Sequence, residues 1–194
     1  MMPAFRDHTP KRRSITRVVN KYGDHKPDLK IDFVSRCGYC NSHDEWKRTY
    51  YEVDHFIPEN ILTIKSLTDY SNLVYACRSC NNSKRKKWPT KDQNVPNRNN
   101  EGFIDPCEDT YLTQFTRTDT GEIMYVTDLG KWIYYALQLH KPQHQIIYIL
   151  EQLEPLVQEI KKLSEDEKIK PEVRDYIFKT YDRYTDYINQ WKGL

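Results

Sequence analysis

Long hydrophobic runs are missing from this sequence of 194 residues. A membrane-spanning helix needs about 20 consecutive apolar residues, and no stretch approaches that length. No secretory signal is expected either, because the sequence opens with Pro3, Phe5, Arg6 and Asp7 rather than a basic patch followed by an apolar segment. Internal repeats and low-complexity tracts are also absent. We therefore expect a globular, cytoplasmic protein that does not bind membranes and has one core, or one compact domain with an extension.

Net charge is low, at +2, but the two halves of the chain differ. Residues 1–91 contain 18 Lys and Arg against 10 Asp and Glu, whereas residues 92–194 contain 12 against 18. Nucleic acids and other polyanions are attracted to positive regions. The first half is therefore the half in which contacts with a polyanion are expected.

Cysteine is scarce, but four of the five cysteines form two pairs of identical spacing, Cys37 with Cys40 and Cys77 with Cys80. In a chain without an export signal such pairs favour metal ligands over disulfides. Four thiolates complete a closed tetrahedral zinc site, which is structural rather than catalytic. The alternatives are a thioredoxin-like redox pair or four unrelated core cysteines, and the repeated spacing favours zinc. Cys107 is expected to be a buried free thiol.

Local patterns predict the elements around these pairs. Helices are expected from Ser14 to Tyr22 and from Pro27 towards Cys37. Aromatic and β-branched residues predict strands at 49–57 and 72–76, and a polar helix should run from Asn81 until Pro89 ends it. The order is strand, long connection, strand, helix.

The second half of the chain is predicted to be mostly helical. The polar stretch 91–101 is typical of a linker, and a turn is expected at 119–121 before a helix at 128–139. Apolar residues recur at threes and fours after Pro142, and the pattern repeats after Pro171, which predicts a helical hairpin. We therefore expect a basic helical segment at 1–36, a core at 37–91 and a helical extension at 92–194.

Polar residues capable of phosphodiester chemistry lie between the two cysteine pairs and directly after the second pair. Asp54 and His55 are adjacent on the first strand, Asn72 precedes the second strand, and Asn81 directly follows Cys80. Over residues 37–87 this order resembles the HNH nuclease family, in which two C-x-x-C pairs frame an acidic residue followed by His, a middle Asn before Leu, and C-N with a later Lys. Asn81 stands where the family name has a third His, as it does in several branches of the family.

The resemblance implies an α+β fold with a ββα-metal core, stapled by the four-cysteine zinc site. It also implies one divalent ion between Asp54 and Asn81, His55 as the general base, and Asn72 bracing the loop. The residue types suit this chemistry, because a histidine can take a proton from water near neutral pH. Carboxylate and amide oxygens suit magnesium or manganese better than zinc. Adjacent strand residues point to opposite faces, so Asp54 and His55 can share a site only if the strand bends or ends there.

Each residue taken alone has a plainer interpretation. His55 could be a core histidine with its hydrogen bonds satisfied, and Asp54 an ordinary carboxylate at a strand end. The combination of both with Asn72, Asn81 and the cysteine frame favours catalysis. A nonenzymatic zinc-ribbon nucleic-acid-binding protein would need the cysteines but not these side chains.

A basic run follows the second cysteine pair and comprises Lys84, Arg85, Lys86 and Lys87. Such a run is by default a solvated helix face, but beside a phosphate-cutting site it also fits contacts with the nucleic-acid backbone. The arm residues Lys11, Arg12, Arg13 and Arg17 could extend that track. No base-reading helix is visible, so the sequence leaves DNA and RNA open, with DNA preferred.

Scattered residues outside the core motif, including the stretches 102–111 and 118–123, look similar to HNH nucleases of bacterial and phage defence systems. One such system is the Septu type, which pairs with an ATPase. This resemblance implies an endonuclease in antiviral defence and a possible ATPase partner subunit. The helical hairpin after Pro142 is the expected docking surface, for that partner or for a second copy. A toxin or effector subunit that acts on RNA is the other alternative.

Overall fold

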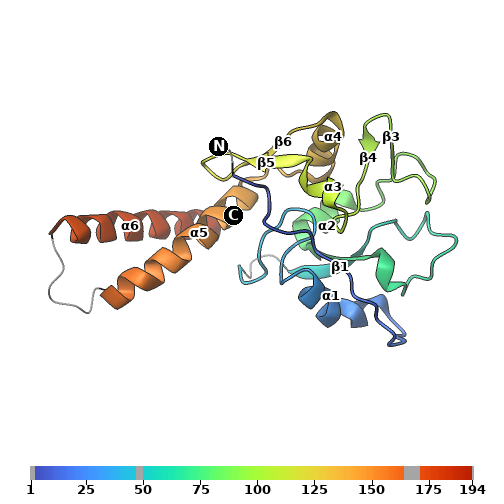
Figure 1. Ribbon diagram of the computed structural model, residues 1–194, viewed down its shortest axis with the longest axis horizontal. Helices are drawn as coiled ribbons and strands as arrows, with labels where there is room; N and C mark the ends of the chain where they lie inside the picture. Colours follow the sequence, from blue (N-terminus) through green and yellow to red (C-terminus); the bar gives the residue numbers. More distant parts are fainter. Residues whose placement is uncertain (1–2, 47–49, 164–170, 194) are drawn as a thin grey trace. The chain divides into compact units, whose positions relative to one another are not determined.

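The computed structural model describes residues 3–46, 50–163 and 171–193 (Figure 1). The chain forms two compact units, Met1–His140 and Lys141–Leu194. The boundary between units therefore lies after His140 and not in the polar stretch 91–101, where the sequence suggested a linker. None of the described helices combines the length and the apolar sequence that a membrane-spanning segment needs.

The N-terminal arm is not helical, in contrast to the helix expected from Ser14 to Tyr22. Residues 11–19 form neither helix nor strand, and a short 3-10 helix, η1 (Tyr22–His25), leads into α1 (Lys26–Asp32). The arm contains Ile15, Thr16, Val18 and Val19, and β-branched residues lose side-chain freedom in a helix. Helix α1 begins at Lys26, one residue before the predicted start at Pro27, and it ends at Asp32 instead of continuing towards Cys37.

The centre of the first unit is a ββα arrangement. Strands β1 (Tyr51–His55) and β2 (Leu73–Cys77) pair antiparallel, with Tyr51 opposite Cys77 and His55 opposite Leu73. Helix α2 (Arg78–Lys84) follows directly and contacts both strands (Figure 1). The α+β class and the order of elements are as predicted. Helix α2 begins earlier than expected, and it ends at Lys84 because Arg85 adopts a φ of 47° and a ψ of −125°.

The polar stretch after α2 folds back on itself instead of linking two units. Strands β3 (Asn97–Arg98) and β4 (Glu101–Gly102) form a short antiparallel pair. Gly102 has a φ of 126°, and a Cβ there would lie 2.2 Å from the Pro96 carbonyl oxygen, so the turn requires glycine. The rings of Trp88 and Phe103 stack across the base of this loop, with centroids 6.3 Å apart. These contacts join the later residues to the core.

The rest of the first unit consists of α3 (Asp109–Leu112), the hairpin of β5 (Phe115–Arg117) and β6 (Ile123–Tyr125), and α4 (Asp128–Leu137). The predicted turn at 119–121 joins β5 to β6. Helix α4 lies where a helix was expected, although Thr127 rather than Asp128 caps it, accepting from the Gly130 amide at 2.9 Å. A single hydrophobic core runs through this unit and includes Leu29, Phe33, Leu73, Tyr75, Phe103, Tyr111, Phe115, Ile133 and Leu137.

The second unit is the predicted helical hairpin. Helices α5 (Pro142–Leu163) and α6 (Pro171–Gly193) lie side by side (Figure 1). The apolar stripe expected on α5 is largely buried, at Ile146, Ile149, Leu150, Leu153, Val157 and Ile160, whereas Leu156 is exposed. On α6, Trp191 is buried, and Val173, Tyr176, Phe178 and Tyr181 are exposed.

Candidate metal centre and active site

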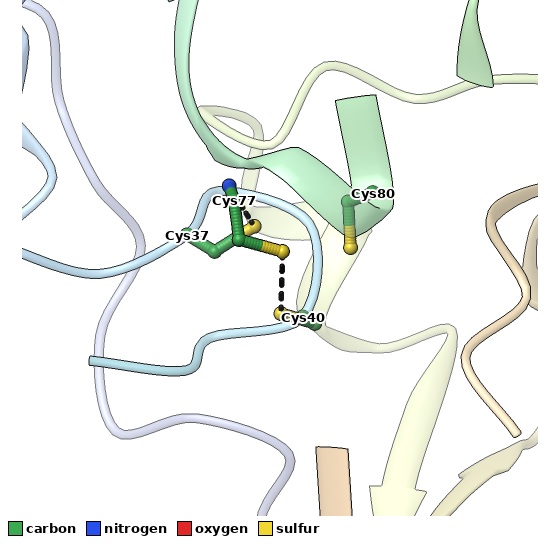
Figure 2. A group of neighbouring side chains, drawn as sticks. All are labelled: Cys37, Cys40, Cys77 and Cys80. Atoms are coloured by element: carbon green, nitrogen blue, oxygen red, sulfur yellow. Dashed lines mark hydrogen bonds between the residues drawn. The ribbon is translucent and has the colours of Figure 1, made fainter. Parts of the chain in front are cut away.

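The four paired cysteines converge on one point. Cys37 and Cys40 lie on the loop after α1, Cys77 ends β2, and Cys80 lies in the first turn of α2. Figure 2 shows the four sulfurs pointing towards one another, and all lie within 4.8 Å of each other. Gly38 fits between the cysteines only because it lacks a side chain, since a Cβ would lie 2.7 Å from the ring of Phe33.

These sulfurs fit a zinc ion. Four sulfurs placed tetrahedrally at about 2.3 Å from one ion lie about 3.8 Å apart. The Cys40 and Cys77 sulfurs are 3.8 Å apart, and the Cys77 amide donates to the Cys37 sulfur at 3.3 Å. Hydrogen bonding to Cys37 and burial hold the pKa of Cys77 and Cys80 well above the usual value, so a cation is what would let four thiolates coexist. The four cysteines could therefore hold zinc.

Cys107 is not part of this group. It is half-buried rather than fully buried, and burial raises its pKa to about 12. Within the described ranges, no second group of three or more His, Cys, Asp and Glu side chains gathers its ligand atoms in this way. Among these described residues, a second ion would therefore have fewer than three protein ligands of these types.

Asp54 and His55 were expected to share a site only if their strand bends or ends there. Strand β1 ends at His55, so this condition is met. Both side chains line one pocket of about 170 Å³ beside the start of the next loop. Asn81 lines the same pocket from α2. The pocket therefore brings together three of the four predicted catalytic residues, and its other lining residues are Tyr22, Val53, Pro58, Glu59, Asn60, Arg85 and Lys86.

His55 has an acceptor beside each ring nitrogen. Nε2 lies 2.8 Å from the Leu67 carbonyl oxygen, and Nδ1 lies 3.3 Å from Glu59 Oε1. Both neighbours only accept hydrogen bonds, so in the neutral ring the proton on Nε2 bonds to Leu67 while Nδ1 keeps its lone pair, and the contact with Glu59 becomes an ion pair only when Nδ1 is protonated. The ring also packs edge-on against Tyr22, with centroids 4.5 Å apart, and is 5% exposed.

Asn72 does not line the pocket but braces the chain that leaves β1. Its side-chain oxygen accepts from the Ile57 amide at 2.9 Å, and its Nδ2 donates to the Ile57 carbonyl at 3.0 Å. The Phe56 amide donates to the Asn72 carbonyl at 2.8 Å. Asn72 is 1% exposed, so this contact fixes the chain directly after His55.

Asn81 is oriented by a carboxylate. Its Nδ2 donates to Glu52 Oε2 at 2.7 Å, and Glu52 is itself 3.6 Å from the Nε of Arg78. Because a carboxylate only accepts, the amide nitrogen must face Glu52 and the carbonyl oxygen is left for another partner.

Asp54 is buried, at 7% exposure, and two donors reach the same carboxylate oxygen. The Tyr39 hydroxyl donates to Oδ2 at 2.5 Å, and Lys84 Nζ lies 3.0 Å from Oδ2. Lys84 Nζ also donates to the His55 carbonyl at 2.6 Å. Burial, together with the charge of Asp54, raises the pKa of Tyr39 well above its usual value, so the phenol stays a donor.

The four residues of the basic run differ in their burial and in their contacts. Lys84 is fully buried, which is incompatible with the exposed phosphate contact predicted for it; the helix turns its side chain inwards to Asp54. Arg85 and Lys86 are exposed and line the pocket. Lys87 donates to the Ala136 carbonyl at 2.7 Å, and partial burial together with Arg85 lowers its pKa.

The arm arginines form ion pairs within the protein instead of extending a basic track. Arg12 makes a two-pronged contact with Asp105, at 2.9 and 3.0 Å, and also donates to the Leu73 carbonyl. Arg13 pairs with Asp32, and Arg17 with Asp28 at 2.8 Å. These pairs explain how an arm without secondary structure is attached to the core.

Sequence reasoning missed several members of the site. Tyr39 lies inside the first cysteine pair but was assigned no role, and Lys84, the lysine of the resembled motif, was assigned a phosphate contact instead of its contact with Asp54. Glu52 is two residues before Asp54 on the same strand face, which is a usable signal. Glu59 and the Leu67 carbonyl approach His55 through the fold of the long connection, for which the sequence carries no signal.

Comparison with known proteins agrees with this geometry. Residues 37–87 match the family model described as HNH endonuclease. A similar curated protein, the Septu protein PtuB of Bacillus mycoides (strain KBAB4), is 30% identical over an alignment covering 50% of this chain and 39% of the relative. The chain thus spans well under half the length of that relative. No solved structure matches.

Proposed function

We propose that this protein is a metal-dependent endonuclease that hydrolyses phosphodiester bonds of DNA, with His55 as the general base. The observation that carries the proposal is the setting of His55. Its Nε2 is committed to the Leu67 carbonyl, and the ring lines the pocket that Asp54 and Asn81 also line. A histidine that only packs in the core does not require a carboxylate and an amide in the same pocket, so the combination of the three supports catalysis. The match of residues 37–87 to HNH endonucleases supports the same chemistry.

In the proposed reaction, Nδ1 of His55 takes a proton from a water molecule while the water oxygen forms a bond to phosphorus. The bond from phosphorus to the leaving oxygen then breaks. Glu59, 3.3 Å from Nδ1, can accept the hydrogen bond of the newly protonated ring. Asn72 keeps the chain after His55 in place through its paired contacts with Ile57.

The free oxygens of Asp54 and Asn81 are the proposed ligands of one divalent ion. Both are hard donors, which suit magnesium or manganese rather than zinc. Magnesium sites in phosphoryl-transfer enzymes commonly use one or two side chains and complete their shell with water and substrate phosphate. When bound, such an ion supplies positive charge at the phosphate and the leaving oxygen. The four-cysteine site is proposed to hold structural zinc.

Arg85 and Lys86 are the proposed contacts with the nucleic-acid backbone, because both line the pocket and are exposed. Lysine and arginine contacts to phosphate position a strand without reading its bases. Lys84 is excluded from this role by its burial. Lys87 is left with a secondary role, because its ammonium already bonds to a carbonyl.

The similarity to a Septu protein supports a role in bacterial antiviral defence. In this proposal the protein acts in the cytoplasm as the nuclease subunit, beside a partner such as an ATPase. The α5 and α6 unit is the proposed docking element, since Tyr176 and Phe178 are 59% and 61% exposed. Exposed aromatic side chains of this kind are enriched where proteins bind one another. Self-association through the same helices is the alternative.

The test is cleavage by the purified, zinc-loaded chain, given plasmid DNA or a single-stranded RNA with manganese, magnesium or a mild chelator. Replacing His55 by Ala should lower the rate ~10²- to 10⁴-fold, the usual cost of losing a general base. His25→Ala is the matched control, because His25 is also buried and also packs edge-on against a tyrosine, Tyr70, at 5.0 Å. Cleavage by His55→Ala at the parental rate would refute the mechanism. Binding to DNA without cleavage of either substrate would favour the zinc-ribbon alternative, and cleavage of RNA alone would favour the RNA-directed effector.

A further inference from the structure

The carboxylate of Asp54 is held asymmetrically. Tyr39 and Lys84 both reach Oδ2, at 2.5 and 3.0 Å. Among the residues that the structure describes, no donor reaches Oδ1. Asp54 nevertheless lines the pocket with Asn81. One oxygen is thus tied to the core, and the other is left for the pocket.

Tyr39 and Lys84 are themselves fixed. Tyr39 is fully buried between two cysteines of the proposed zinc site, and its backbone carbonyl accepts from the Tyr111 hydroxyl at 2.9 Å. Lys84 has no exposed surface, lies one helical turn beyond Cys80, and sits over the ring of Phe103 with its Nζ 5.8 Å from the centroid. Neither side chain can reach solvent or substrate. Their polar atoms therefore serve other parts of the protein.

We propose that Tyr39 and Lys84 are positioning residues that tie Oδ2 of Asp54 to the cysteine frame and so reserve Oδ1 for the divalent ion. This inference rests on the proposed function. Each cysteine pair contributes one of the two donors, Tyr39 from the first pair and Lys84 from the helix begun by the second. Lys84 also holds the His55 carbonyl at 2.6 Å, so the same ammonium fixes the backbone at the point where β1 ends. The structural metal site thereby sets the orientation of the catalytic carboxylate.

Tyr39 and Lys84 differ in the charge that their removal would change. Removing Lys84 would change both the orientation of Asp54 and the charge beside the ion, and these effects oppose each other. Removing the Tyr39 hydroxyl changes no charge. Loss of a partner that orients a metal ligand typically weakens metal binding by about 10- to 100-fold. Tyr39→Phe therefore tests positioning alone.

The experiment measures manganese binding to the zinc-loaded full chain by electron paramagnetic resonance of the free ion, with zinc content and melting temperature recorded in parallel. Tyr39→Phe is expected to bind manganese about 10-fold more weakly than the parent while keeping its zinc. Tyr70→Phe is the matched control, since it also loses one buried tyrosine hydroxyl that donates to a buried carboxylate, at 2.6 Å, but that carboxylate is Asp32 and not Asp54. It should bind manganese as the parent does. Placing p-aminophenylalanine at position 39 restores a neutral donor and should restore the affinity.

The outcomes are distinguishable. If the parent binds no manganese, or if Asp54→Ala binds it as tightly as the parent, the proposed ion site is wrong and this inference falls with it. If the parent binds and Asp54→Ala does not, but Tyr39→Phe binds as tightly as the parent, the ion site stands and the positioning role is overturned. Loss of zinc by Tyr39→Phe would also overturn it, because the hydroxyl would then serve the fold and not Asp54.

Discussion

Replacing Lys84 by Met should destabilise the first unit far more than loss of a surface lysine would. The Lys84 side chain is 0% exposed and its partner Asp54 is 8% exposed, so the pair is shielded from water. Methionine can fill the space of the aliphatic stem, but it leaves Asp54 Oδ2 with Tyr39 alone and the His55 carbonyl without its donor. Removing one partner of a buried ion pair costs about 3–5 kcal/mol, whereas an exposed pair contributes about 0–1 kcal/mol.

This cost translates into a large shift in melting temperature. For a unit of this size, 1 kcal/mol corresponds to about 3 °C, so Lys84→Met should melt about 10–15 °C below the parent. Lys87→Met is the control, because its ammonium also bonds to a carbonyl but its side chain is exposed. That control should melt within about 3 °C of the parent. Tryptophan fluorescence in zinc-containing buffer is the assay, since Trp88 and Trp132 lie in this unit.

A second variant checks the reason for the loss. Apolar residues can replace a buried ion pair with little loss of stability, so Lys84→Met combined with Asp54→Leu should recover at least half of the lost melting temperature. A melting temperature of Lys84→Met within about 3 °C of the parent, or a double variant less stable than Lys84→Met, would show that the buried pair does not stabilise the unit in this way.

Three further predictions concern other parts of the chain. The protein should contain one tightly bound zinc per chain, so Cys77→Ser should lose zinc and fold poorly; elemental analysis that finds no zinc in the parent would contradict this. Replacing Arg85 and Lys86 together by Gln should weaken binding to all DNA sequences alike and reduce the slope of log affinity against log salt by about 2, which a fluorescence titration at several salt concentrations measures. A hydrogen bond from Tyr184, opposed by burial, lowers the pKa of Glu154, so Tyr184→Phe should raise that pKa in a carbon-13 NMR titration. A carboxylate whose pKa is lower in the folded than in the unfolded protein stabilises the fold at pH values above the unfolded pKa. This stabilisation is lost as the pH falls through the folded pKa. The stability lost in Tyr184→Phe should therefore be largest at neutral pH and vanish in acid.

The sequence predicted those parts of the fold that local patterns determine. The spacing of the cysteines, the apolar stripe of α5 and the strand order around Asp54 and His55 are all repeated or periodic signals. The structure reproduces each of them. The N-terminal arm was mispredicted because its conformation depends on Arg12 and Arg13 reaching Asp105 and Asp32, which are far away in sequence or on another element. The polar stretch 91–101 was mispredicted because its composition does not reveal the stacking of Trp88 on Phe103.

Within the site, the position of Lys84 is what the sequence could not predict. In the sequence it is one of four consecutive cations, and composition cannot distinguish it from Arg85 or Lys86. In the structure it is the last residue of α2, and the reversal of the backbone at Arg85 separates it from the exposed pair. Helical phase and the end of the helix, not charge, decide which cation faces Asp54.

Part of the positive charge in the first half of the chain is neutralised by ion pairs within the protein and is therefore not available to bind nucleic acid. Arg12, Arg13 and Arg17 are all paired with carboxylates of the same unit. Of the predicted basic run, Arg85 and Lys86 are the two that line the pocket. Each phosphate contact contributes about 0.9 to the salt slope, so two contacts give a slope of about −2, which is shallow for a protein that must hold DNA alone. We therefore expect the isolated chain to bind DNA weakly at physiological salt, and we expect a partner docked on α5 and α6 to supply the remaining affinity by holding the pocket near its substrate.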